Sequence, residues 1–128
     1  MTIIQDYLKL TKELINNYGE KSLVLMQVGS FFECYALLEK DGSYSGSLIK
    51  EFAEINDMTI SRKNMCVGHQ NVMMAGFGLP QLEKYIKKLQ DNGFTIAVYT
   101  QDSPSKNTTR SLQCIYSPGT YFSQDSQE

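Results

Sequence analysis

An excess of positive charge is what this chain lacks most clearly. Its 12 lysines and arginines are outnumbered by 14 aspartates and glutamates, which gives a formal net charge of -2. A protein that holds nucleic acid by phosphate contacts alone carries a basic excess, because those contacts supply most of the non-specific affinity. The charge balance therefore excludes a protein that holds nucleic acid by phosphate contacts alone. Any contact with nucleic acid must be local or assisted.

Cysteine is scarce, and long apolar runs are absent. The three cysteines, Cys34, Cys66 and Cys114, are far apart and odd in number, so they do not form a disulfide framework. This usage predicts a reducing compartment. The first 15 residues mix charged residues such as Asp6 and Lys9 with apolar ones, and they form neither a signal peptide nor a membrane span. The sequence therefore predicts a soluble protein with no membrane partner.

The motifs of nucleotide and metal sites are also missing. No G-x-x-x-x-G-K-[ST] phosphate loop occurs, and the segment GSYSGS lacks the lysine such a loop needs. Cys66 and His69 have the spacing of two zinc ligands, but no second pair completes a four-ligand site. A small thiol enzyme that uses Cys34 or Cys66 with His69 stays open as an alternative, although no local signature supports it.

What is present suffices for one compact domain, since the chain has 128 residues of which 41% are hydrophobic. Apolar spacing predicts three helices and six strands, with a kink or bulge between the first two strands and a polar, glycine-rich turn at residues 39–47. Their order predicts an α+β fold, a mixed β-sheet flanked by about three helices in a single domain. The expected helices are residues 4–18, 48–56 and 82–89, and the expected strands are residues 23–28, 31–38, 58–63, 72–74, 94–101 and 110–116.

One strand, within VGSFFECYALL, carries a carboxylate between apolar residues. Because side chains alternate along a strand, Phe31, Glu33 and Tyr35 should share one face and Phe32 should point to the other. Glu33 need not be buried on this pattern, and Phe31 is expected to be exposed. The alternative is that Phe31 packs under a loop and Glu33 is merely solvated.

Two groups of basic residues suit a solvated surface as well as a DNA-contact surface. Arg62 and Lys63 end the strand expected at residues 58–63, and three lysines lie on the outer face of the last helix, at positions 84, 87 and 88.

Four segments, taken in this order, resemble the MutS mismatch-repair proteins. VGSFFECY resembles the family's G-D-F-Y-E segment, and DMTISRK resembles its D-I-x-L-T-x-R strand. Residues 73–101 resemble its M-A-G-[IV]-P…Y-x-x-K-L…G-x-x-V-A-[IV]-x-[ED]-Q block, and IYSPGT resembles V-T-P-G-T. The resemblance runs from about residue 3 to residue 120. The variants FFECYAL, NTTRSL and SPGTYF are most similar to the branch found in large DNA viruses and some mitochondrial genomes.

The resemblance implies that residues 1–120 are a mismatch-recognition domain and that residues 121–128 are a frayed tail or the start of a linker. It implies mismatched or lesion-containing double-stranded DNA as the partner. Phe31 would enter the minor groove and stack on a mispaired base, and Glu33 would hydrogen-bond that base. Arg62 and Lys63 are the further DNA-binding candidates.

For the rest of the protein, the resemblance implies connector, lever, clamp and ATPase domains outside these residues. ATP, Mg²⁺ and homodimer contacts belong to those domains, so neither a cofactor nor enzyme activity is expected of this one. The implied compartments are the cytoplasm, a viral factory or a mitochondrion.

The chain also departs from the family pattern. Ser30 stands where the family often has Asp, Phe32 replaces Tyr, and the turn at residues 39–47 is longer than in bacterial members. AGFGLPQ replaces A-G-I-P-Y-H, which removes a histidine. A second function therefore stays open: a structural or protein-interaction module of a MutS homologue that does not read lesions directly.

Overall fold

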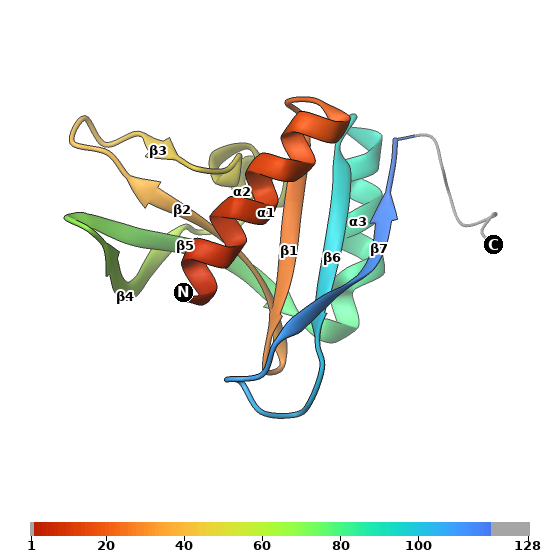
Figure 1. The fold of residues 1–128 in the computed structure, drawn as a ribbon. Helices are drawn as coiled ribbons and strands as arrows, with labels where there is room; N and C mark the ends of the chain where they lie inside the picture. The colour runs from red at the N-terminus through yellow and green to blue at the C-terminus, as the bar shows by residue number, and fades with distance from the viewer. Residues whose placement is uncertain (1, 119–128) are drawn as a thin grey trace.

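The computed structural model describes residues 2–118. In these residues three α-helices pack on a seven-stranded mixed sheet, so the predicted α+β fold is confirmed (Figure 1). The expected tail, residues 121–128, and the last two residues of IYSPGT lie outside the described residues. The helices are α1 (Ile3–Tyr18), α2 (Ile49–Asn56), the short 3-10 helix η1 (Leu79–Gln81) and α3 (Leu82–Asp91); the strands are β1 (Ser22–Val28), β2 (Phe31–Leu38), β3 (Tyr44–Ser45), β4 (Ser61–Val67), β5 (Gln70–Gly78), β6 (Thr95–Gln101) and β7 (Arg110–Tyr116).

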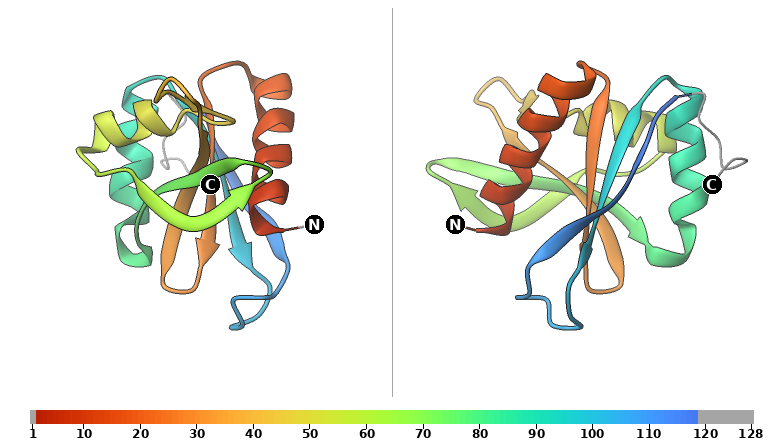
Figure 2. Two further views of the ribbon diagram at one scale, coloured as in Figure 1. Left: turned by 90° about the vertical axis from the view of Figure 1, so that its left-hand side faces the viewer. Right: turned by 45° about the vertical axis from the view of Figure 1, so that its right-hand side comes forward.

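The sheet places β2 near its middle. The strand order is β4-β5-β2-β1-β6-β7, with β3 paired to β2 outside this path. Strands β1 and β6 are parallel, whereas the other pairs are antiparallel. Helix α1 covers one face of the sheet, and α2 and α3 cover the other (Figure 2). Strand β2 is therefore enclosed from both sides along most of its length.

Local sequence explains the placement of α1. Thr2 and Gln5 form a reciprocal capping box at its first turn, which satisfies backbone N–H groups that the helix leaves free. Its apolar stripe then packs on β1 and β2, where the hydroxyl of Tyr7 donates a hydrogen bond of 2.7 Å to the carbonyl oxygen of Val24. This bond fixes the helix against the middle of the sheet.

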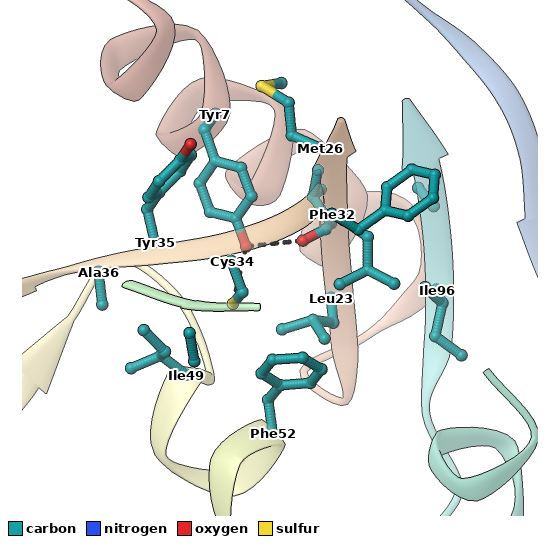
Figure 3. Packing of buried hydrophobic residues seen from close by; sticks show 14 of the residues in the cluster. Tyr7, Leu23, Met26, Phe32, Cys34, Tyr35, Ala36, Ile49, Phe52 and Ile96 are labelled. Carbon is teal, nitrogen blue, oxygen red and sulfur yellow. Dashed lines mark hydrogen bonds between the residues drawn. The ribbon is translucent and has the colours of Figure 1, made fainter. Parts of the chain in front are cut away.

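The two faces of β2 carry the residues that alternation predicts. Phe32 is buried and packs toward α2 and α3, with its ring centroid 6.0 Å from that of Phe77. On the other face, Tyr35 meets Tyr7 of α1 edge to face at 5.1 Å (Figure 3). Phe31 is 53% exposed and Phe32 only 4%. The predicted face assignment of these two rings is confirmed.

Three details of the strands differ from the sequence prediction. Strands β1 and β2 form a hairpin with Gly29 and Ser30 as its turn, not a kinked pair; Gly29 has a φ of +62°, which glycine adopts at little cost. The turn at residues 39–47 contains the short strand β3, which folds back on β2. Strand β4 begins at Ser61, so Arg62 lies near its start and not its end. Hydrogen bonding to β5, and not apolar content, carries β4 through its polar residues.

A polar network holds the hairpin turn against the loop between β6 and β7. The side-chain oxygen of Gln101 accepts a hydrogen bond of 2.5 Å from the backbone N–H of Gly29. The backbone N–H of Gln101 donates to the side-chain oxygen of Gln27 at 2.8 Å. Arg110 Nε donates to the carbonyl oxygen of Gln27 at 2.6 Å. These bonds fix the backbone that immediately precedes Phe31.

The first prediction separates the two adjacent phenylalanines. Phe32→Ala should lower the free energy of unfolding by roughly 3–5 kcal/mol, because it empties a core site. Phe31→Ala should change it by no more than about 0.5 kcal/mol, since the residue is exposed and is not one of the buried core residues. Urea denaturation of the 128-residue chain measures both. A larger loss for Phe31→Ala than for Phe32→Ala would contradict the face assignment.

The second prediction concerns the turn. Gln101→Ala removes the acceptor of the Gly29 N–H, so hydrogen exchange of that amide should speed up about tenfold, the effect of losing one hydrogen bond. Amide exchange followed by NMR measures this directly. The matched control is Gln113→Ala, because Gln113 is exposed on the neighbouring strand β7. Equal exchange rates at Gly29 in both variants would show that the turn is held by other contacts.

Candidate nucleic-acid interface

The exposed ring of Phe31 stands beside a stretch of bare backbone. Across the β2–β5 ladder, Phe31 pairs with Gly78 and Glu33 pairs with Gly76. Neither glycine presents a side chain next to the two site residues. A Cβ atom at Gly76 would lie 2.4 Å from the carbonyl oxygen of Phe32, so only glycine fits there. The segment AGFG therefore leaves open backbone beside both Phe31 and Glu33.

Glu33 is buried, which corrects the expectation that it would face solvent. Its side chain is 8% exposed and forms an ion pair of 2.7 Å with Lys63 Nζ. The hydroxyl of Tyr35 donates a second hydrogen bond to the same carboxylate. Strand alternation placed Glu33 on the correct face, but helix α1 and strand β4 enclose that face. A carboxylate buried in this way needs partners, and Lys63 and Tyr35 are those partners.

Tyr35 keeps its proton in this setting. Burial is the main reason that the pKa of Tyr35 rises well above its usual range, and the hydrogen bond to Glu33 and the negative charge of Glu33 raise it further. A tyrosine with a raised pKa remains an O–H donor throughout the physiological range. Lys63 also lies 5.4 Å from the centre of the Tyr35 ring, a cation–π distance. The three side chains thus form one cluster, the Glu33–Lys63–Tyr35 cluster.

The structure separates the two basic candidates on β4. The side chain of Lys63 is 21% exposed and points toward β2, whereas Arg62 is exposed and lies on the other face of this edge strand. The register of β4 against β5 shifts between Arg62 and Cys66, and Asn64 in this bulge has a φ of +66°. Lys63 therefore belongs to the cluster with Glu33, and Arg62 does not. The three α3 lysines are on the opposite side of the sheet.

A hollow of about 740 Å³ opens on the face of the sheet that α1 covers, between α1 and the loop that joins β6 to β7. Its lining includes Val28, the hairpin partner of Phe31, and both Tyr35 and Lys63 of the cluster. The charged side chains of the lining are Asp6, Lys9, Glu13, Lys63, Lys106 and Arg110. The hollow therefore carries both signs of charge and is not a uniformly basic channel.

The thiol-enzyme alternative finds no support at Cys34. This thiol is fully buried, with its sulfur 3.0 Å from the hydroxyl oxygen of Tyr7. Burial raises the pKa of Cys34 to about 12, so the reactive thiolate is not formed near neutral pH. Cys66 is exposed and faces Asn71 across the β4–β5 hairpin. Within residues 2–118, no three His, Cys, Asp or Glu side chains gather as a metal site.

Sequence reasoning missed the residues that support Phe31 and Glu33. Tyr35 was placed on the correct face, but its bond to Glu33 was not predicted. The spacing of two residues in one strand was the available signal. Gln27, Gln101 and Arg110 are far apart in the sequence, and no local pattern marked them as a network around the turn.

No helix in residues 2–118 combines the length and apolar character needed to cross a bilayer.

Three relatives match this chain at modest identity. A mutS homolog of Acanthamoeba polyphaga mimivirus is 26% identical over 95% of this chain, and DNA mismatch repair protein MutS 2 of Haloarcula marismortui is 29% identical over 84%. A mitochondrial DNA mismatch repair protein mutS homolog of Sarcophyton glaucum is 26% identical over 91%. The viral and mitochondrial matches agree with the predicted branch.

The chain spans 11%, 10% and 14% of the lengths of these three relatives, in the same order. The model of the family described as MutS domain I matches residues 3–125, which is almost the whole chain. The resemblance found in the four sequence segments is thereby confirmed, and the chain belongs to the MutS domain I family.

Proposed function

We propose that this domain reads mispaired or unpaired bases in double-stranded DNA, as the recognition part of a mismatch-repair protein. Its membership of the MutS domain I family supports this, and so do the names of its relatives, which are DNA mismatch repair proteins or mutS homologs. In this proposal, other domains of the full-length protein hold the duplex, bind ATP and Mg²⁺, and form the homodimer.

The observation that carries the proposal is the exposure of Phe31. A large apolar ring that is half exposed makes little contribution to the core, yet the polar network of Gln27, Gln101 and Arg110 holds the backbone beside it. Gly78, which pairs with Phe31 across the β2–β5 ladder, carries no side chain. A fixed, projecting ring of this kind is suited to enter a minor groove and to stack on a base.

Base unstacking supplies the discrimination. Opening a base step costs a few kcal/mol and costs least where the base is mispaired or unpaired. Stacking an aromatic ring on a base returns about 1–3 kcal/mol whatever the base is. The balance therefore favours insertion at a mismatch over insertion at a matched step. The ease of bending the duplex at the same step adds to this preference.

We assign Arg62 and Lys63 different parts in the proposal. Arg62 is exposed on the sheet edge, where a phosphate contact would help to position the duplex without reading its sequence. Lys63 is engaged by Glu33, so its effect on DNA binding acts through that carboxylate. The longer turn at residues 39–47 lies at the opposite end of β2 from Phe31, so it does not flank the inserted ring.

One observation favours the alternative of a structural or interaction module. Glu33 already has two partners within the domain, and a carboxylate engaged in this way serves the fold whether or not DNA is read. If the domain is such a module, the full-length protein should bind mismatched and matched duplexes equally well.

The third prediction tests Phe31 against a matched control. Phe31→Ala should reduce the ratio of matched to mismatched dissociation constants of the full-length protein to about 1, because the stacking energy of about 1–3 kcal/mol is lost. Tyr18→Ala should leave that ratio unchanged, since Tyr18 is equally exposed, at 51%, but ends α1. Fluorescence anisotropy with a mismatched and a matched duplex measures the ratio. If the ratio is unchanged in Phe31→Ala, the Phe31 ring is not the wedge that enters the minor groove.

The fourth prediction concerns the 128-residue chain by itself. With a net charge of -2 it should bind duplex DNA more weakly than micromolar at physiological salt, because too few phosphate contacts are available. Titration of a labelled mismatched duplex checks this. Micromolar or tighter binding would show that the domain holds DNA without assistance.

A further inference from the structure

Both hydrogen bonds that Glu33 receives end on the same oxygen. Lys63 Nζ donates to Oε1 at 2.7 Å, and the Tyr35 hydroxyl donates to Oε1 as well. A carboxylate oxygen offers about two acceptor positions, so these two donors occupy Oε1. The carboxylate is thereby held by two donors at Oε1.

The other oxygen, Oε2, accepts no hydrogen bond from residues 2–118. It is also not sealed inside the protein. Oε2 of Glu33 is not among the fully buried side-chain oxygens that lack a hydrogen-bond partner in the described part of the chain. The bare backbone of Gly76 borders the carboxylate on the β5 side. An acceptor with open positions is therefore available two residues from Phe31, on the same face.

The charge of Lys63 also changes what the carboxylate can do near DNA. A lone carboxylate would be repelled by the phosphates on both sides of a minor groove. The ammonium group at 2.7 Å balances that charge locally. A carboxylate can only accept hydrogen bonds.

We propose that Lys63 and Tyr35 are positioning residues, which hold Glu33 by Oε1 so that Oε2 accepts a hydrogen bond from an N–H group of the displaced base. The inference rests on the proposed function and adds a preference for the chemical class of the base. Thymine and guanine carry a ring N–H on the pairing edge. Cytosine and adenine carry a ring nitrogen there that only accepts, and the cytosine amino group faces the major groove.

The fifth prediction compares two unpaired pyrimidines in otherwise identical duplexes, because their rings stack over similar areas. The full-length protein should bind an unpaired thymine at least about tenfold more tightly than an unpaired cytosine, the effect of one hydrogen bond to a charged group. Lys63→Met removes the ammonium group and keeps the side-chain length. It should reduce the ratio of the cytosine dissociation constant to the thymine dissociation constant to within about twofold. Lys63→Arg should retain the ratio, because it keeps the cation.

Two further variants guard against a trivial loss of folding. Tyr35→Phe removes one hydroxyl and keeps the ring. It should lower the preference in affinity for unpaired thymine over unpaired cytosine, in a protein that still melts cooperatively. Lys9→Met removes a cation from the same face that has no role in the cluster, and it should leave the ratio unchanged.

The outcomes separate this inference from the proposed function. An unchanged ratio in Lys63→Met and Tyr35→Phe, or tighter binding of cytosine by the unaltered protein, overturns the positioning role while mismatch preference persists. If the unaltered protein binds both unpaired pyrimidines no better than a matched duplex, the proposed function fails and this inference fails with it.

Discussion

Strand β2 is enclosed on both faces of the sheet, so the charge of Glu33 has to be balanced inside the fold. Helix α1 closes one face, and α2 and α3 close the other. Lys63 supplies the balance from the edge strand β4, with β5 between it and Glu33. Removing one partner of a buried ion pair costs several kcal/mol, because the remaining charge stays buried. Lys63 lies where the register of β4 shifts after Arg62, and it also makes the cation–π contact with Tyr35.

Phe31 and Glu33, which are two residues apart on β2, follow opposite physical rules. Phe31 lies at the first position of β2, where it is half exposed and pairs with Gly78 across the β2–β5 ladder. Glu33 lies only two residues further along and is already buried. The segment therefore combines an exposed ring with a carboxylate whose Oε1 is held by two donors. Such an arrangement suits a reader that first inserts and then tests one hydrogen bond.

Rigidity of the turn complements that arrangement. The bonds from Gln101 to Gly29 and Gln27 tie the hairpin to the neighbouring β6–β7 connection. Without them, a two-residue turn with an exposed ring would sample several orientations, and ordering it on DNA would cost conformational entropy. Energy spent on ordering is not available for distinguishing mismatched from matched steps. The network thus links residues that are about 70 positions apart to the geometry of the proposed wedge.

The sequence by itself determined the fold class, the order of the main elements and the alternation of Phe31 and Phe32, because these follow from hydrophobic periodicity within single segments. It also determined the family, since the four motifs occur in order along the chain. Only the tertiary structure decided that Glu33 is buried, that Lys63 and not Arg62 reaches it, and that Gln101 supports the turn. Each of these facts depends on which strands lie side by side. The neighbours of a strand are set by long-range pairing, which the residues of that strand alone do not predict.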